Sequence, residues 1–81
     1  MDNNNEFIGS GSYERFADLA QLRTNRALKT IQTIGNLSNK TNYQYKSQDV
    51  KKIIKILRAA ISETEKKFDN QINGGEKKFS L

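Results

Sequence analysis

Apolar side chains recur every three or four residues in two stretches of the chain. The first stretch begins at Tyr13 and continues with Phe16, Leu19, Ala20, Ala27, Leu28, Ile31 and Ile34. At about 100° per residue these positions fall in one broad arc, which is the pattern of an amphipathic helix. We therefore predict a helix over about residues 13–35. Ser12 is a suitable N-cap for it, and Gly35 is suited to end it in the left-handed conformation.

The second stretch lies in the other half of the chain. Its apolar positions are Val50, Ile53, Ile54, Leu57, Ala60, Ile61 and Phe68. They predict a helix over about residues 48–70, with Ser47 as its N-cap and Gly74–Gly75 beyond its end. Thr64 falls within the apolar arc, where its methyl packs and its hydroxyl bonds the carbonyl of Ala60 one turn back.

Two helices of matched length joined by a moderate loop predict an antiparallel helical hairpin, so the expected fold class is all-α. Each helix has roughly 22 residues and a length of about 33 Å. We place the hairpin over residues 12–73, with its loop at about residues 36–47. The polar ends are expected to form a disordered tail over residues 1–11 and a flexible tail over residues 74–81.

The predicted hairpin provides only a small hydrophobic core for a chain of 81 residues. Its register brings Phe16 opposite Phe68 at the open end. The apolar arc of the second helix widens to about 160° when Ile56 is included, which is more than one facing helix covers. We therefore expect two hairpins to associate as a homodimer that forms a four-helix bundle. The alternative is that this surface binds a different protein.

Arg23 interrupts the apolar arc of the first helix, and in the hairpin register its nearest carboxylate is that of Glu65. In one interpretation the arginine methylenes cover apolar surface while the guanidinium reaches Glu65 or water. In the other, a partly buried Arg23 specifies the register of the dimer. Both roles are structural, because an Arg–Glu pair alone offers no nucleophile and no base partner for catalysis.

The composition argues against an enzyme. The chain has no cysteine and no histidine, which removes thiolate chemistry, the commonest general base and the commonest metal ligand. No carboxylate pair stands at catalytic or metal-ligand spacing, so we expect no metal, no cofactor and no small-molecule substrate. No stretch approaches the roughly 18 apolar residues of a membrane span, and the start lacks a signal-peptide pattern. The expected location is the cytoplasm.

A basic face is the strongest charge signal in a chain whose net charge is +5. Lys51, Lys55 and Arg58 lie at i, i+4 and i+7, away from the apolar arc, and Arg26 and Lys29 lie at i and i+3 on the first helix. Such a face is ordinarily a solvated helix surface. The alternative is a nucleic-acid-binding accessory protein that neutralises phosphates with these five side chains.

The segment between the helices is rich in asparagine and tyrosine. Its polar and aromatic residues are Asn36, Asn39, Asn42, Tyr43 and Tyr45. In one interpretation the asparagines satisfy backbone groups of the turn and the tyrosine rings pack against the end of the hairpin. In the other, the tyrosines form an interface anchor or stack on bases, and the segment contacts a partner.

Residues 13–68 resemble a group of short, uncharacterised bacterial proteins. The resemblance rests on Arg23-Thr24-Asn25 in the first helix, the loop sequence Gly35-Asn36-Leu37-Ser38-Asn39 and the element Asn42-Tyr43-Gln44-Tyr45, followed by a second helix that closes on Phe68. It implies a folded module without an assigned activity. The sequence as a whole favours a small non-enzymatic protein-interaction or regulatory module that acts through a helix face and the Asn/Tyr loop.

Overall fold

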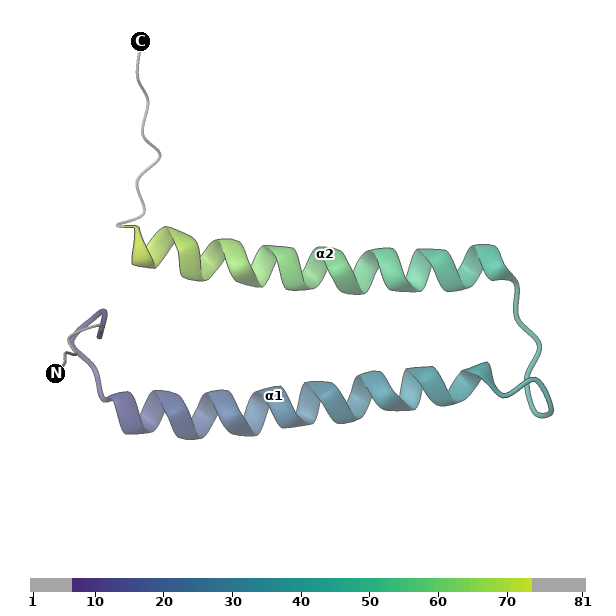
Figure 1. Cartoon of the computed structure of the whole chain (residues 1–81), viewed down its shortest axis with the longest axis horizontal. Coiled ribbons are helices and arrows are strands. Elements are labelled where there is room, and N and C mark those ends of the chain that lie inside the picture. Colours follow the sequence, from purple (N-terminus) through teal and green to yellow (C-terminus); the bar gives the residue numbers. More distant parts are fainter. Residues whose placement is uncertain (1–6, 74–81) are drawn as a thin grey trace, which may run out of the picture. The chain divides into compact units, whose positions relative to one another are not determined.

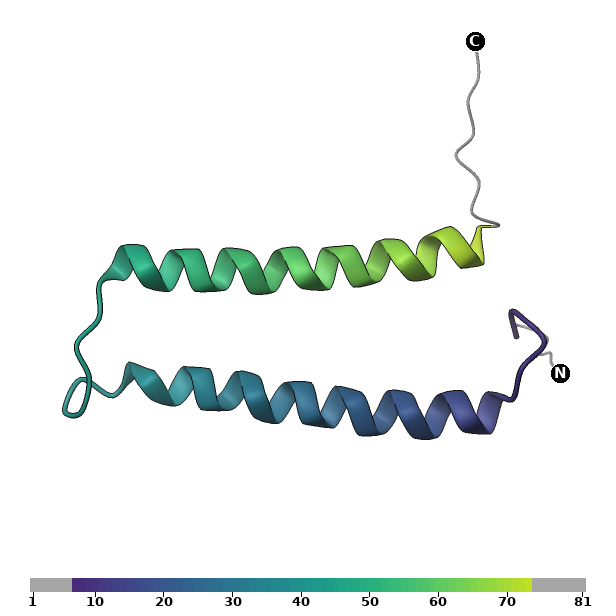
Figure 2. The same ribbon diagram turned by 180° about the vertical axis from the view of Figure 1, so that it is seen from behind.

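The computed structural model of the protein describes residues 7–73, and this part of the chain is helical without strands. Helix α1 spans Tyr13–Gly35, a short 3₁₀-helix η1 spans Asn36–Ser38, and helix α2 spans Ser47–Ile72 (Figure 1). The same elements are seen from behind in Figure 2. The all-α fold class is therefore confirmed. Of the tails expected over residues 1–11 and 74–81, residues 1–6 and 74–81 lie outside the described residues.

Helix α1 begins with the predicted cap. Ser12 has extended backbone angles (φ −82°, ψ 126°). Its Oγ accepts a hydrogen bond of 3.2 Å from the backbone N–H of Arg15. Glu14 lies in the first turn, where a negative charge is favourable beside the positive end of the helix dipole. The start of α1 thus follows directly from the serine and the acidic residue that flank Tyr13.

The predicted end of α1 is wrong in its conformation. Gly35 is not left-handed: its φ of −60° and ψ of −30° are those of a right-handed helix. The chain tightens into η1 instead, and the N–H of Asn36 bonds the carbonyl of Gln32. A left-handed glycine is needed where the chain reverses at the last turn, whereas a 3₁₀ turn satisfies the terminal carbonyls without reversal.

The predicted cap of α2 is wrong by one residue. Lys46 occupies the N-cap position with extended angles (φ −101°, ψ 140°), and Ser47 is already helical. A lysine side chain has no acceptor, so it makes no side-chain cap bond. Its carbonyl accepts from the N–H groups of Asp49 and Val50 at 3.0 and 3.2 Å. Helix α2 continues to Ile72, two residues beyond the expected end.

Three threonine hydroxyls bond to backbone carbonyls within the helices. Thr64 Oγ1 donates to the carbonyl of Ala60 at 2.9 Å, as predicted. Thr30 donates to the carbonyl of Arg26 at 3.0 Å, and Thr33 donates to that of Thr30 at 2.6 Å. These polar side chains therefore satisfy their hydroxyls locally and leave their methyl groups for packing.

The chain divides into two units between Gln44 and Tyr45. The first unit contains α1, η1 and the turn that follows them, and the second contains α2. Three predicted features would join the two units. They are the antiparallel pairing of α1 with α2, the ring contact of Phe16 with Phe68 and the ion pair of Arg23 with Glu65. These features stay predictions.

Candidate interaction surfaces

The apolar face of α1 has no buried residue. Phe16, Leu28 and Ile31 are exposed along it, while the smaller Ala17 and Ala20 are half-buried. The arc alternates in steps of four and three residues. The side chains in this repeat are Tyr13, Ala17, Ala20, Thr24, Ala27, Ile31 and Ile34. An uncovered seam of this kind is the surface a helix buries against another helix.

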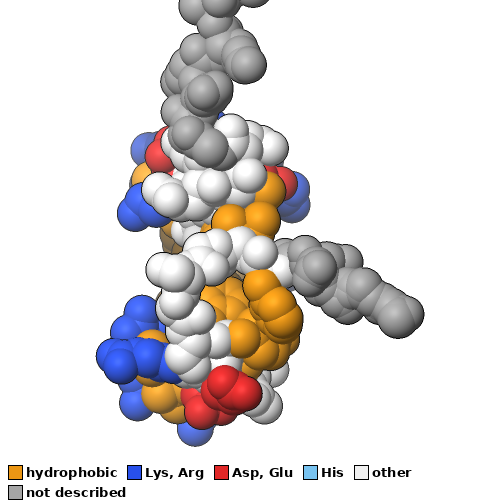
Figure 3. Space-filling model, turned by 90° about the vertical axis from the view of Figure 1, so that its left-hand side faces the viewer, with side chains coloured by type: hydrophobic (Ala, Val, Ile, Leu, Met, Phe, Trp, Pro, Cys, Tyr) orange, Lys and Arg blue, Asp and Glu red, His pale blue; other side chains and the backbone are white. Residues whose placement is uncertain are grey.

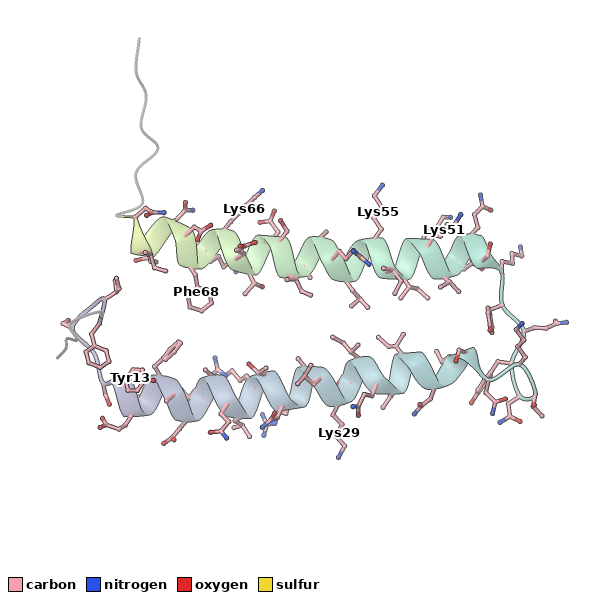
Figure 4. All side chains as sticks on the ribbon, in the orientation of Figure 1. Tyr13, Lys29, Lys51, Lys55, Lys66 and Phe68 are labelled. Carbon is pink, nitrogen blue, oxygen red and sulfur yellow. The ribbon has the colours of Figure 1, made fainter. Side chains whose placement is uncertain are left out.

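Helix α2 carries a second seam with larger side chains. Its positions are Val50, Ile54, Leu57, Ile61, Thr64 and Phe68. No residue of α2 is buried. Ile61 within the seam is 63% exposed, and Ile56 at the edge of the arc is 68% exposed. Figure 4 shows Phe68 on the side of α2 opposite Lys51, Lys55 and Lys66.

An aromatic cluster marks the start of α1. The ring centroids of Phe7 and Tyr13 are 5.0 Å apart with planes tilted by 55°, and those of Tyr13 and Phe16 are 6.4 Å apart. Hydrophobic side chains gather at this end of α1 in Figure 3. Tyr13 and Phe16 are spaced at i, i+3, so the sequence predicts that they are neighbours on the surface of a helix. No comparable pattern in the sequence predicts the contact of Phe7 with Tyr13.

A groove on α2 brings basic and apolar side chains together. It has a volume of about 400 Å³ and is lined by Val50, Lys51, Ile54, Lys55 and Arg58. Lys51 and Lys55 project from the same side of α2 in Figure 4. The structure thus unites three of the five cations that the sequence suggested for an anion-binding face. The other two, Arg26 and Lys29, are exposed on α1 and belong to the first unit.

The charges along α2 are distributed unevenly. An ion pair of 3.8 Å joins Glu63 and Lys66, both exposed, near its C-terminal end. Within the groove, by contrast, the residues at i±3 and i±4 from Lys51, Lys55 and Arg58 include no Asp or Glu. Lys51 and Lys55 are themselves separated by four residues, a spacing at which like charges repel. The first half of α2 is therefore a local concentration of positive charge.

The asparagines of the connecting segment build its turn. The Oδ1 of Asn39 accepts from the N–H of Thr41 at 3.0 Å. The carbonyl of the same residue accepts from the N–H groups of Asn42 and Tyr43 at 3.1 and 3.0 Å, and the carbonyl of Asn36 accepts from the Asn39 N–H at 3.4 Å. The side chain of Asn39 thus has the structural role predicted for it, and Asn36 and Asn42 take part through backbone groups.

The two tyrosines of the segment fall in different units. Tyr43 ends the Asn39 turn and is 48% exposed, and Tyr45 is exposed at the start of the second unit. Arg23 is exposed on α1 and Glu65 is exposed on α2, again in different units. The structure therefore leaves the partner-contact role of the tyrosines and the Arg23–Glu65 pair as predictions.

Within residues 7–73, no group of three or more acidic residues is arranged to hold a metal ion. Neither described helix is long and apolar enough to cross a membrane. No known protein family, curated protein or solved structure gives a significant match to the chain.

Proposed function

We propose that the protein is a small non-enzymatic interaction module that works by docking amphipathic helix faces, first with a second copy of itself. The observation that carries this proposal is the apolar face along each helix, none of whose residues is buried. Apolar surface contributes about 25 cal/mol per Å² when it is removed from water, so faces of this length are stable only when covered.

The sizes of the side chains support an antiparallel pairing of α1 with α2. When Ile34 lies opposite Val50, the same register places Ala27 opposite Leu57. It also places Ala20 opposite Thr64. The seam of α1 is thus rich in alanine where the seam of α2 carries larger residues, and large-to-small matching of this kind lets two helices interdigitate closely.

A strip at the side of this hairpin remains for a partner. An antiparallel helix pair has an approximate twofold axis perpendicular to the plane that contains the two helix axes. Residues with the same angular offset from their own seam therefore lie on the same side of this plane. Leu19 on α1 and Ile56 on α2 share an offset of about −120° at 100° per residue. Ile53 and Ala60 lie between Ile56 and the seam of α2. We name this set, Leu19, Ile53, Ile56 and Ala60, the lateral strip.

A second copy is the simplest partner for the lateral strip. Two hairpins related by twofold symmetry bury the same strip on both sides, which produces a four-helix bundle. Ile56 is exposed, which agrees with this role. In the bundle Arg23 lies beside the strip, where its methylenes cover apolar surface and its charge disfavours other registers.

The test measures molecular mass by sedimentation equilibrium over a wide range of protein concentration. The unmodified chain should show a reversible equilibrium between 9.3 kDa and twice that mass. The double variant Ile53→Glu/Ile56→Glu places two charges in the strip and should shift dimerisation to at least about tenfold higher concentration. The matched control Gln48→Glu/Ala59→Glu adds the same charge outside the lateral strip, on the face of α2 opposite its seam, and should dimerise normally. A chain that stays monomeric at the highest concentration would refute the homodimer and leave the strip to a different protein.

A further inference from the structure

We infer that Lys51, Lys55 and Arg58 form a binding site for the phosphate backbone of a nucleic acid, without selection for base sequence. The site is the groove on α2 in which these three side chains surround Val50 and Ile54. It lies within one unit of the chain. Val50 and Ile54 also belong to the seam of α2, so the site rests on the three basic side chains, which lie outside the seam and outside the lateral strip.

The distribution of charge along the chain is the first argument. Residues 25–60 contain eight of the 14 Lys and Arg residues and one of the nine Asp and Glu residues, a net charge of +7, against −2 for the rest of the chain. An ordinary solvated helix face mixes the two signs, as α2 does where Glu63 pairs with Lys66. A one-sided concentration of cations attracts polyanions and accelerates their association.

The local surroundings of the three cations are the second argument. Lys51, Lys55 and Arg58 have no carboxylate one turn away on either side, and the Lys51–Lys55 spacing adds a like-charge repulsion of a few tenths of a kcal/mol. These charges reduce the stability of the isolated helix. A bound anion would remove the repulsion between these cations. We therefore assign the three side chains to the binding of an anionic ligand.

The spacing of the cations fits a phosphate backbone. Lys51 and Arg58 are seven residues apart and therefore about 10 Å apart along the helix axis. Phosphates of one DNA strand are separated by about 3.4 Å along the duplex axis, so the groove spans about three of them. Val50 and Ile54 line the same groove and offer apolar surface to the aliphatic parts of the basic side chains.

An anionic membrane surface is the competing ligand. A basic amphipathic helix binds such a surface by burying its apolar face in the lipid. On α2 that face is the seam from Val50 to Phe68, which we assign to helix packing. The nucleic acid is therefore the favoured partner, because it needs only the three basic side chains and not the seam.

The test measures fluorescence anisotropy of a short labelled DNA duplex titrated with the full chain. Neutralising three phosphates predicts a log–log salt slope of about −2.7, which is a loss of affinity of about 40-fold between 50 and 200 mM salt. The variant Lys51→Gln/Lys55→Gln/Arg58→Gln should weaken binding at 50 mM salt by about tenfold or more and flatten the salt slope. Glutamine is a good helix former, so circular dichroism should show unchanged helix content.

The matched control is Arg15→Gln/Lys66→Gln/Lys67→Gln. It removes the same charge from cations that have acidic residues one turn away, and it should retain most of the affinity and the salt slope. Equal losses in both variants would show an effect of net charge alone and overturn the site. Absence of binding by the unmodified chain at 50 mM salt would also overturn it. So would binding to vesicles of phosphatidylserine and phosphatidylcholine when the duplex is not bound.

Discussion

At the scale of single residues, a few side chains decide where the regular structure begins. Ser12 precedes α1 and bonds the N–H of Arg15, and Asn39 bonds the N–H of Thr41 to shape the turn. Both are short polar side chains whose oxygen reaches a backbone donor two or three residues on. Lys46 lacks such an oxygen, so α2 begins without a side-chain cap. The two helices therefore differ in how firmly their first turns are held.

The cap of α1 provides a prediction at this scale. Ser12→Ala removes the acceptor of the Arg15 N–H bond and should lower the free energy of unfolding by about 1 kcal/mol. Urea unfolding of the full chain followed by circular dichroism measures the change. Ser10→Ala is the control, because Ser10 precedes the helix and is exposed. If the two variants unfold at the same urea concentration, the cap contributes nothing to stability.

At the scale of the elements, the helices are amphipathic and locally well formed but depend on partners for stability. Neither has a buried residue of its own, and most helical stability in proteins comes from packing of the apolar face. The seams differ in side-chain size, which favours packing of α1 against α2 over packing of either seam against itself. The lateral strip and the basic groove then lie on different faces of α2.

The junction of α1 with η1 gives a prediction that separates two conformations of Gly35. Its right-handed angles are open to any residue, and a Cβ added there meets nothing within 4 Å. Gly35→Ala should therefore raise the free energy of unfolding by roughly 0.5–1 kcal/mol, because it reduces the freedom of the unfolded chain. A left-handed Gly35 would give the opposite sign. Thermal or urea unfolding of this variant beside the unmodified chain distinguishes the two.

At the scale of the whole molecule, the proposed hairpin and dimer make the distant ends of the chain interdependent. Phe16 near the start of α1 and Phe68 near the end of α2 would meet in the proposed register. Covering both seams and the lateral strip turns two marginal helices into one cooperative unit. The positive charge of residues 25–60 would then gather at the end of the hairpin that holds the connecting segment.

The pairing of the two ends predicts the effect of one aromatic residue. Phe68→Ala should cost about 3 kcal/mol of unfolding free energy if its ring is buried against α1. Leu22→Ala is a suitable control, since Leu22 lies opposite the apolar arc, and it should cost less than about 0.5 kcal/mol. Both are measured by urea unfolding at one fixed protein concentration, because a dimer gains stability with concentration. A nearly neutral Phe68→Ala variant would rule out the proposed register.

The periodicity of the sequence was sufficient to place both helices and the cap at Ser12, because helical hydrogen bonds and caps join residues three or four apart. The same reasoning anticipated the bond of Thr64 to the carbonyl of Ala60. It failed at Gly35 and at Ser47, where two backbone conformations are compatible with the same residue. Local sequence patterns predict the presence and type of an element more reliably than the residues at which it begins and ends.

The remaining features of the protein depend on its three-dimensional structure. The contact of Phe7 with Tyr13 and the turn centred on Asn39 depend on backbone angles that no spacing specifies. The spacing of Lys51, Lys55 and Arg58 placed them on one face, but the groove that they share with Val50 and Ile54 depends on side-chain conformers. The division of the chain between Gln44 and Tyr45 likewise emerged only from its contacts in space. The amino-acid pattern thus determined the helices and their faces through local interactions, whereas the sites depend on how those faces and turns are arranged in three dimensions.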